Sequence, residues 1–237
     1  MDSICVDSVS DTLKVYQKPG VFRYGTDAVL LANFAARHIT SAKPQHFCDL
    51  CAGTGIVGLM LCDGKKSLHG TLVEINAEAS ELSARSAQIS GLDTRVNAVC
   101  ADLVHVKDRF APESFDFVTC NPPYMTAGCG KLCTDDAITA ARHEIFCTVA
   151  DVMNAASFLL PTGGSAYLVY RTERLAALMK AADAAKLAVK ELVFVQTKAS
   201  DAECRLVLCR AVKGAKAGMK TFVKTAKELL SPDETLK

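Results

Sequence analysis

The strongest constraint on the fold is a regular alternation of short apolar runs with longer amphipathic segments between residues 46 and 185. We predict strands at 46–51, 71–75, 96–102, 115–120 and 163–170, and helices at 55–63, 77–91, 148–159 and 173–185. Parallel neighbours need a crossover connection, so this alternation predicts a parallel sheet covered by helices on both faces. Two further apolar runs, 187–197 and 204–212, follow one another without a helix between them and predict an antiparallel pair. The sequence therefore predicts an α/β fold with a doubly wound, mostly parallel, seven-stranded sheet whose last strand is antiparallel.

Shorter segments flank this predicted core. Residues 12–24 contain Lys18-Pro19-Gly20 and predict a hairpin, and Thr26 or Asp27 is expected to cap the helix that follows. At the other end, the five lysines between 213 and 227 are spaced 3, 4, 4 and 3 residues apart, which would put them on one face of a helix. We therefore divide the chain into an N-terminal hairpin and helix (1–45), a core domain (46–213) and a basic C-terminal tail or helix (214–237).

Composition excludes several classes of protein. No apolar run approaches the roughly 18 residues that span a bilayer, and the N-terminus lacks the apolar core of a signal peptide. The eleven cysteines are scattered and mostly lie in apolar segments, as free thiols do. A zinc site would need the Cys48 and Cys51 pair to meet Cys129 and Cys133, and we expect none because Cys48 lies on a predicted core strand. With a net charge of +1, only the local cluster of lysines suggests a polyanionic partner. We expect a cytoplasmic protein, monomeric for preference, with no metal and no membrane contact.

A glycine-rich turn follows the first predicted strand of the core. The stretch DLCAGTGIVG contains Gly53-x-Gly55-x-x-Gly58, a spacing typical of loops that bring a backbone close to a nucleotide. Glu74 ends the next strand, where an acid can accept hydrogen bonds from ribose hydroxyls, and Asp102 ends the third. Both NAD and S-adenosylmethionine contain an adenosine, but Asp49 would repel a pyrophosphate and suits a cationic sulfonium. Asp49 and Asp102 are equally open to interpretation as capping residues.

The fourth predicted strand ends in the stretch CNPPYM, residues 120–125. An amino group on a planar base or amide is a poor nucleophile, and the Asn121 side-chain oxygen and the Pro122 carbonyl can each accept one of its N–H groups. The two prolines fix the direction of that carbonyl, and Tyr124 offers a ring on which a planar group can stack. A plain turn is the alternative interpretation. Placed at the carboxyl end of a strand, the motif predicts methyl transfer to a planar –NH2 group.

In this order, DLCAGTG, VEI, AD and NPPY resemble the class I S-adenosylmethionine-dependent methyltransferases, which have a Rossmann-like sheet. The resemblance covers roughly residues 20–210. It implies a catalytic motif and a cofactor site. The catalytic residues would be Asn121, Pro122, Pro123 and Tyr124. The cofactor-binding residues would be Thr26, Asp49, Cys51, Ala52, Gly53, Thr54, Gly55, Glu74, Ile75, Asp102, Leu103 and Asn121.

The segment VFRYGTDAVLLANF (21–34) resembles the opening of the bacterial family that methylates N6 of an adenine in the anticodon loop of a valine tRNA, and Arg142-His143-Glu144 is also similar to that family. This resemblance implies an RNA adenine-N6 methyltransferase with tRNA as its partner. We expect substrate contacts from Tyr124, Arg23, Lys216 and Lys220. The alternatives are a glutamine-N5 methyltransferase of release factors, a cofactor-binding protein without catalysis, and a nicotinamide-dependent oxidoreductase.

Overall fold

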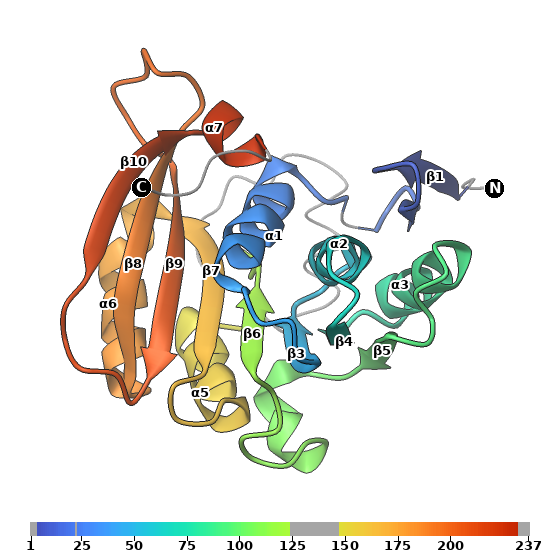
Figure 1. Cartoon of the computed structure of the whole chain (residues 1–237), viewed down its shortest axis with the longest axis horizontal. Helices are drawn as coiled ribbons and strands as arrows, with labels where there is room; N and C mark the ends of the chain where they lie inside the picture. Colours follow the sequence, from blue (N-terminus) through green and yellow to red (C-terminus); the bar gives the residue numbers. More distant parts are fainter. Residues whose placement is uncertain (1–3, 22, 124–146, 232–237) are drawn as a thin grey trace.

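The computed structural model of the chain describes residues 4–21, 23–123 and 147–231. These residues form one large sheet with helices on both faces, as predicted (Figure 1). In chain order its strands are β3 (Gln45–Leu50), β4 (Leu68–Glu74), β5 (Val96–Cys100), β6 (Phe117–Cys120), β7 (Ser165–Arg171), β8 (Leu187–Gln196), β9 (Leu206–Lys213) and β10 (Lys220–Thr225). Their spatial order is β10-β8-β9-β7-β6-β3-β4-β5, and only the two pairs made by β9 are antiparallel. The seventh strand of this sheet is thus antiparallel, and β10 makes an eighth.

Helices on the two faces of the sheet bury two separate apolar layers. One face is covered by α1 (Thr26–His38), α2 (Ile56–Gly64) and α3 (Ala77–Ile89), and the other by the 3-10 helix η1 (Leu103–Asp108), α5 (Val149–Leu159) and α6 (Leu175–Ala184) (Figure 1). Successive strand residues point to opposite faces, so Phe47 joins the first layer and Cys48 the second, both without exposed surface. A sheet buried on both faces explains why these strands are almost continuously apolar. No helix within the described ranges is long and apolar enough to cross a membrane.

The predicted N-terminal hairpin has its turn in a different place. Strands β1 (Cys5–Ser8) and β2 (Lys14–Gln17) pair antiparallel around a turn in which the Val9 N–H donates to the Leu13 carbonyl. Lys18-Pro19-Gly20 does form a turn, closed by the Val21 N–H on the Lys18 carbonyl, but this turn leads the chain from β2 toward α1. The prediction placed the hairpin turn at the wrong residues, because two turns lie close together and Pro-Gly gives the stronger sequence signal.

The capping residue of α1 also differs from the prediction. The helix is capped by Gly25, which has no side chain to accept a hydrogen bond, and Thr26 is its first residue. Asp27 instead accepts a hydrogen bond from the Ala28 N–H, one residue along. The helix is therefore where the sequence places it, with its boundary shifted by one residue.

The predicted helical stripe of lysines does not exist, because the segment that carries it is divided among three elements. Lys213 ends β9, Lys220 and Lys224 belong to β10, and Lys227 lies in α7 (Ala226–Leu230). Spacings of three and four residues suggested a helix, but β10 pairs with β8 over its whole length, and its Phe222 packs on the core while Val223 faces solvent. That alternation is the period of a strand.

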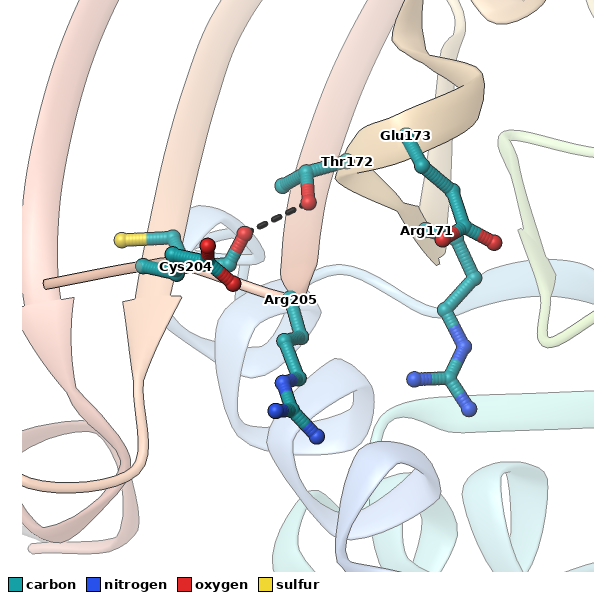
Figure 2. Close-up of a pocket in the computed structure, with 6 residues that line it drawn as sticks. Arg171, Thr172, Glu173, Cys204 and Arg205 are labelled. Carbon is teal, nitrogen blue, oxygen red and sulfur yellow. Dashed lines mark hydrogen bonds between the residues drawn. The ribbon is translucent and has the colours of Figure 1, made fainter. Parts of the chain in front are cut away.

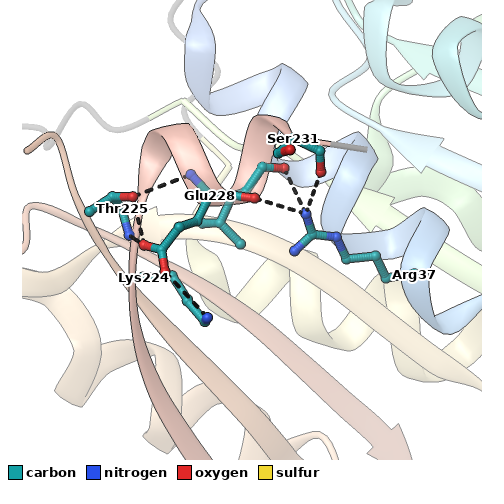
Figure 3. A network of polar contacts seen from close by, with 6 residues as sticks. Arg37, Lys224, Thr225, Glu228 and Ser231 are labelled. Carbon is teal, nitrogen blue, oxygen red and sulfur yellow. Dashed lines mark hydrogen bonds and ion pairs between the residues drawn. The ribbon is translucent and has the colours of Figure 1, made fainter. Parts of the chain in front are cut away.

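Hydrogen bonds from a side chain of α1 to backbone carbonyl groups near the end of α7 attach this short helix to α1. The Arg37 guanidinium donates to the backbone oxygens of Glu228, Leu229 and Ser231 at 3.2, 3.1 and 3.2 Å (Figure 3). At the other end of α7, Thr225 and Glu228 form a capping box, and Lys224 pairs with Glu228. Hydrogen bonds from the Thr225 hydroxyl and N–H, with help from Lys224, lower the pKa of Glu228 to about 2. These contacts anchor β10 and α7 to the core.

Replacing Arg37 with Ala should loosen this C-terminal segment without unfolding the sheet. Three carbonyl oxygens lose their hydrogen bond from Arg37, although that of Leu229 still accepts one from the Asn33 side chain. A hydrogen bond from a charged group is worth roughly 1.5–3 kcal/mol. We expect amide hydrogens in β10 and α7 to exchange at least about tenfold faster, measured by mass spectrometry. Amides of β3 and β6 serve as the internal control, and equal acceleration there would show that the contact is not local.

Candidate active site

Among the predicted cofactor-binding and catalytic residues, Asp102 and Leu103 follow β5, and most of the others lie at the carboxyl ends of β3, β4 and β6. Strand β3 lies between the other two, and the chain proceeds from it to β4 and β5 on one side before it crosses to β6 on the other. This is the switch point of a doubly wound sheet, where ligands bind. The register pairs Leu50 with Cys120. The glycine loop, which begins at Cys51, and the segment that begins at Asn121 therefore leave the sheet side by side.

The three glycines of the loop fulfil different requirements. Gly53 and Gly55 have φ angles of 56° and 88°, and a Cβ on Gly53 would meet no atom within 4 Å. A Cβ on Gly55 would lie 2.5 Å from Ser83 Oγ, and one on Gly58 would lie 2.2 Å from Leu72 Cδ2. Gly55 and Gly58 thus let α2 pack tightly against α3 and β4, whereas Gly53 leaves open space at the end of β3. This space is where a nucleotide can approach the backbone.

Asp49 is buried beneath this loop and connects three elements. Its side chain accepts hydrogen bonds from the Thr119 hydroxyl on β6 (2.6 Å) and from the Gly58 N–H in the first turn of α2 (3.2 Å). Because the N-cap residue of α2 is Gly55, which has no side chain, Asp49 supplies the acceptor that a cap would provide. Burial raises the pKa of Asp49 to about 7, against the lowering effect of these two donors. Through its contacts with α2 and β6, Asp49 takes the capping role that the sequence had left open for it.

Two more acids border the loop. Glu74 is half-buried at the end of β4, where its carboxylate accepts hydrogen bonds from the Gly53 N–H (2.8 Å) and the Asn76 N–H (2.9 Å). Each carboxylate oxygen has a second lone pair, so this acid can still accept hydrogen bonds from a ligand. Asp102 caps η1 by accepting from the Val104 N–H at 2.9 Å. Beside Glu74, Ile75 is 41% exposed and offers an apolar surface, whereas Leu103 is buried.

The NPPY motif begins where β6 loses its partners. The last paired residue of β6 is Cys120, after which Asn121 is half-buried, Pro122 is buried and Pro123 is exposed. Neither proline has an N–H, so neither can extend the pairing of β6. Tyr124 and Arg142-His143-Glu144 lie outside the described residues. The two acceptors that the sequence analysis assigned to catalysis, the Asn121 side chain and the Pro122 carbonyl, thus follow the strand that neighbours the glycine loop.

The remaining predicted residues are spread more widely. Ala52 and Thr54 are buried in the glycine loop, and Thr26 is exposed at the start of α1. Arg23 is exposed and pairs with Asp7. Lys216 precedes β10 and Lys220 begins it, on the outermost strand of the sheet and four places from β6, so the structure does not bring these lysines to the site.

Sequence reasoning missed Gln17, which connects the N-terminal hairpin to the glycine loop. Its side-chain amide donates to Thr54 Oγ1 at 2.9 Å, and the residue is only 1% exposed. The Gln17 side-chain oxygen is buried with no partner among the described residues. No motif points to Gln17, since a single glutamine at the end of a short strand has no signature. The hairpin thus supports the loop from outside the sheet.

Three thiols meet behind the glycine loop. Cys51 Sγ lies 3.7 Å from Cys147 Sγ, and Cys51 also hydrogen bonds with Cys120, the residue before Asn121. The contact with Cys120 raises the pKa of Cys51, the contact with Cys51 raises that of Cys147, and burial raises that of Cys120. The described part of the chain contains no group of three side chains able to hold a metal ion. The raised pKa values keep these three thiols protonated at neutral pH.

Alkylation should distinguish these thiols from the exposed ones. Only a thiolate reacts with iodoacetamide, and each unit by which a pKa rises lowers the thiolate fraction about tenfold. In the folded protein at pH 8, we expect Cys51, Cys120 and Cys147 to react at least about tenfold more slowly than Cys5 and Cys100, which are exposed. Peptide mass spectrometry would measure the rates. The same peptides in denaturant are the control, because there all five thiols should react alike.

The raised pKa of Asp49 predicts how stability depends on pH. The folded protein keeps a proton on Asp49 up to about pH 7, whereas the ordinary value is 3.8, so between these values the folded state binds more protons than the unfolded state. The contribution of Asp49 to the free energy of unfolding therefore falls as pH rises through that window. Asp49→Asn preserves one acceptor and one donor but does not titrate.

Between pH 5 and 8, the stability of Asp49→Asn relative to the unaltered chain should rise by about 1–3 kcal/mol, measured by urea unfolding. Parallel pH profiles for the two proteins would show that Asp49 is ionised throughout this range.

Comparison with known proteins identifies the family. The family model described as "Methyltransferase small domain" matches residues 12–182, which is more than half of the chain. The chain belongs to the methyltransferase small domain family. The prediction of an S-adenosylmethionine-dependent methyltransferase is thereby confirmed.

Curated relatives and solved structures agree with this membership. The chain is 29% identical over 177 residues to a tRNA1(Val) (adenine(37)-N6)-methyltransferase of Porphyromonas gingivalis, an alignment that covers 74% of this chain and 69% of the relative. It is 28% identical to a protein of the same name from Shewanella loihica, with coverages of 78% and 74%. A solved structure of a predicted O-methyltransferase from Agrobacterium tumefaciens superposes with a TM-score of 0.67 at 22% identity, over 84% of this chain and 86% of that one. At such identity the solved structure shows the shared fold.

Proposed function

We propose that this protein transfers a methyl group to N6 of an adenine in RNA, and specifically in the anticodon loop of a tRNA. The observation that carries the proposal is the register of β3 and β6, which brings the glycine loop and Asn121-Pro122 out of the sheet together in a chain 29% identical to a named tRNA adenine-N6 methyltransferase. A loop adenine is unstacked at modest cost, which suits a site that has to receive an isolated base.

The residues at the ends of β3 and β4 fit S-adenosylmethionine. Gly53 faces open space, Glu74 has lone pairs available for ribose hydroxyls, and the exposed face of Ile75 suits an adenine ring. Asp102 is our candidate for the adenine amino group. Asp49 favours a cation only in its ionised form, above its pKa of about 7. When bound, the cofactor supplies an electrophilic methyl group on a sulfonium.

The acceptor base would be held by the motif after β6. The Asn121 side-chain oxygen and the Pro122 carbonyl each accept one N–H of the adenine amino group, which directs the nitrogen lone pair and stabilises the positive charge that develops on it. After transfer, the nitrogen loses a proton to solvent. Stacking of the base on Tyr124 remains a prediction from the sequence.

Methyl transfer to three classes of substrate tests the proposal. Labelled S-adenosylmethionine would be incubated with unmodified tRNA, with release factor and with duplex DNA, followed by nucleoside analysis. We expect label in tRNA as N6-methyladenosine. Label in release factor would preserve the chemistry of Asn121-Pro122 and overturn the RNA assignment. Label in none of the three would contradict the proposed function.

Asn121→Ala should separate catalysis from cofactor binding. Removal of one acceptor of a developing charge typically lowers kcat by about 100-fold to 1,000-fold. We expect a loss of that order in methyl transfer, with the Kd for S-adenosylhomocysteine changed less than about threefold, as measured by calorimetry. Asn97→Ala, on the exposed side of β5, is the matched control and should retain full activity. An active Asn121→Ala would remove Asn121 from the mechanism.

A further inference from the structure

A pocket of about 640 Å³ lies at the end of β7, next to the strand that leads into Asn121. Its lining includes two arginines, and Figure 2 shows how they are arranged. The lining residues are Arg171, Thr172, Glu173, Glu203, Cys204 and Arg205. Among the described residues, neither the glycine loop nor Asn121–Pro123 lines it, and its described lining is distinct from the residues assigned above.

Strand pairing brings the two arginines together. Strands β7 and β9 are antiparallel, and Arg171 pairs with Leu206, so Arg171 ends one strand at the level where Arg205 leads into the other. The Thr172 N–H donates to the Arg205 carbonyl at 3.2 Å, and the Thr172 hydroxyl donates to the Cys204 carbonyl at 2.5 Å. In Figure 2 both guanidinium groups extend to the same side, away from Thr172. The backbone of this pocket is therefore held in place independently of any ligand.

The pocket opens at the same edge of the sheet as the proposed catalytic motif. Strands β6 and β7 are parallel neighbours in which Cys120 pairs with Leu168. Arg171 lies three residues past Leu168, or about 10 Å further along at roughly 3.3 Å per residue. An RNA strand with its target base at Asn121 would extend over the end of the adjacent strand, where these arginines lie. Lys220, by contrast, begins the outermost strand of the sheet, and Lys216 precedes that strand.

The arginines and the glutamates of the pocket suit different parts of a nucleotide. Guanidinium groups bind phosphate oxygens through paired N–H donors. The carboxylates of Glu173 and Glu203 are exposed acceptors, which suit the ribose 2′-hydroxyl as a donor. We propose that this pocket binds the phosphodiester and ribose of a nucleotide flanking the target adenine. The inference rests on the proposed function, which it deepens by naming how the RNA chain is held.

The test compares Arg205→Ala with Arg109→Ala. Both residues are exposed and each substitution removes one positive charge, but Arg109 lies in the segment that leads into the amino end of β6. For Arg205→Ala we expect the KM for tRNA to rise about tenfold, while kcat and the KM for S-adenosylmethionine stay within about twofold. The slope of log K for RNA binding against log salt should also fall in magnitude by about 0.7, the value for one phosphate contact on a single strand.

The outcomes separate this inference from the function on which it rests. If the unaltered protein methylates tRNA and both variants behave alike, the pocket does not bind the RNA and the inference is overturned alone. A change in the KM for S-adenosylmethionine instead would assign the arginines to the cofactor and would also overturn it. If the unaltered protein methylates no tRNA, the proposed function fails and the inference fails with it.

Discussion

The hydrogen bonds of the Asp49 carboxylate hold together the parts of the site that have to act in concert. One oxygen accepts from Thr119 on β6 and the other from Gly58 in α2. Asp49 itself lies on β3, two residues before the glycine loop begins. One buried side chain thus connects the strand before the glycine loop, the helix after that loop and the strand that leads into Asn121. A methyl transfer depends on the alignment of donor and acceptor, so the proposed chemistry depends on this linkage.

The glycine loop depends on this linkage and on Glu74. The N-cap residue of α2 provides no side chain for the N–H groups of the first turn, and Asp49 on β3 accepts a hydrogen bond from one of them, that of Gly58. Glu74 holds the Gly53 N–H from the other side, and Gln17 holds Thr54 from the hairpin. The open space at Gly53 therefore has a fixed outline before any ligand binds, which lowers the entropy lost on binding. Gly55 and Gly58, by comparison, owe their identity to the packing of α2.

The sequence was sufficient for the core of the fold, because hydrophobic period and crossover rules are local signals. The runs at 46–51 and 71–75 became β3 and β4, and the residues after them belong to the candidate site. The C-terminal segment was mispredicted because a lysine at every third or fourth position fits a helix, whereas the pairing of β10 with β8 depends on a partner some 30 residues earlier in the chain. The pocket at Arg171 and Arg205 could not be predicted for the same reason: it depends on the pairing of β7 with β9, which has no signature in either strand alone.

A crystal structure of the chain with S-adenosylhomocysteine would test the central claim most directly. We predict that the ribose hydroxyls lie within hydrogen-bond distance of the Glu74 carboxylate, that the adenine contacts Ile75, and that the homocysteine sulfur faces Asn121. A ligand bound away from the ends of β3 and β4, or a chain that binds NADH in that place and not S-adenosylhomocysteine, would contradict it.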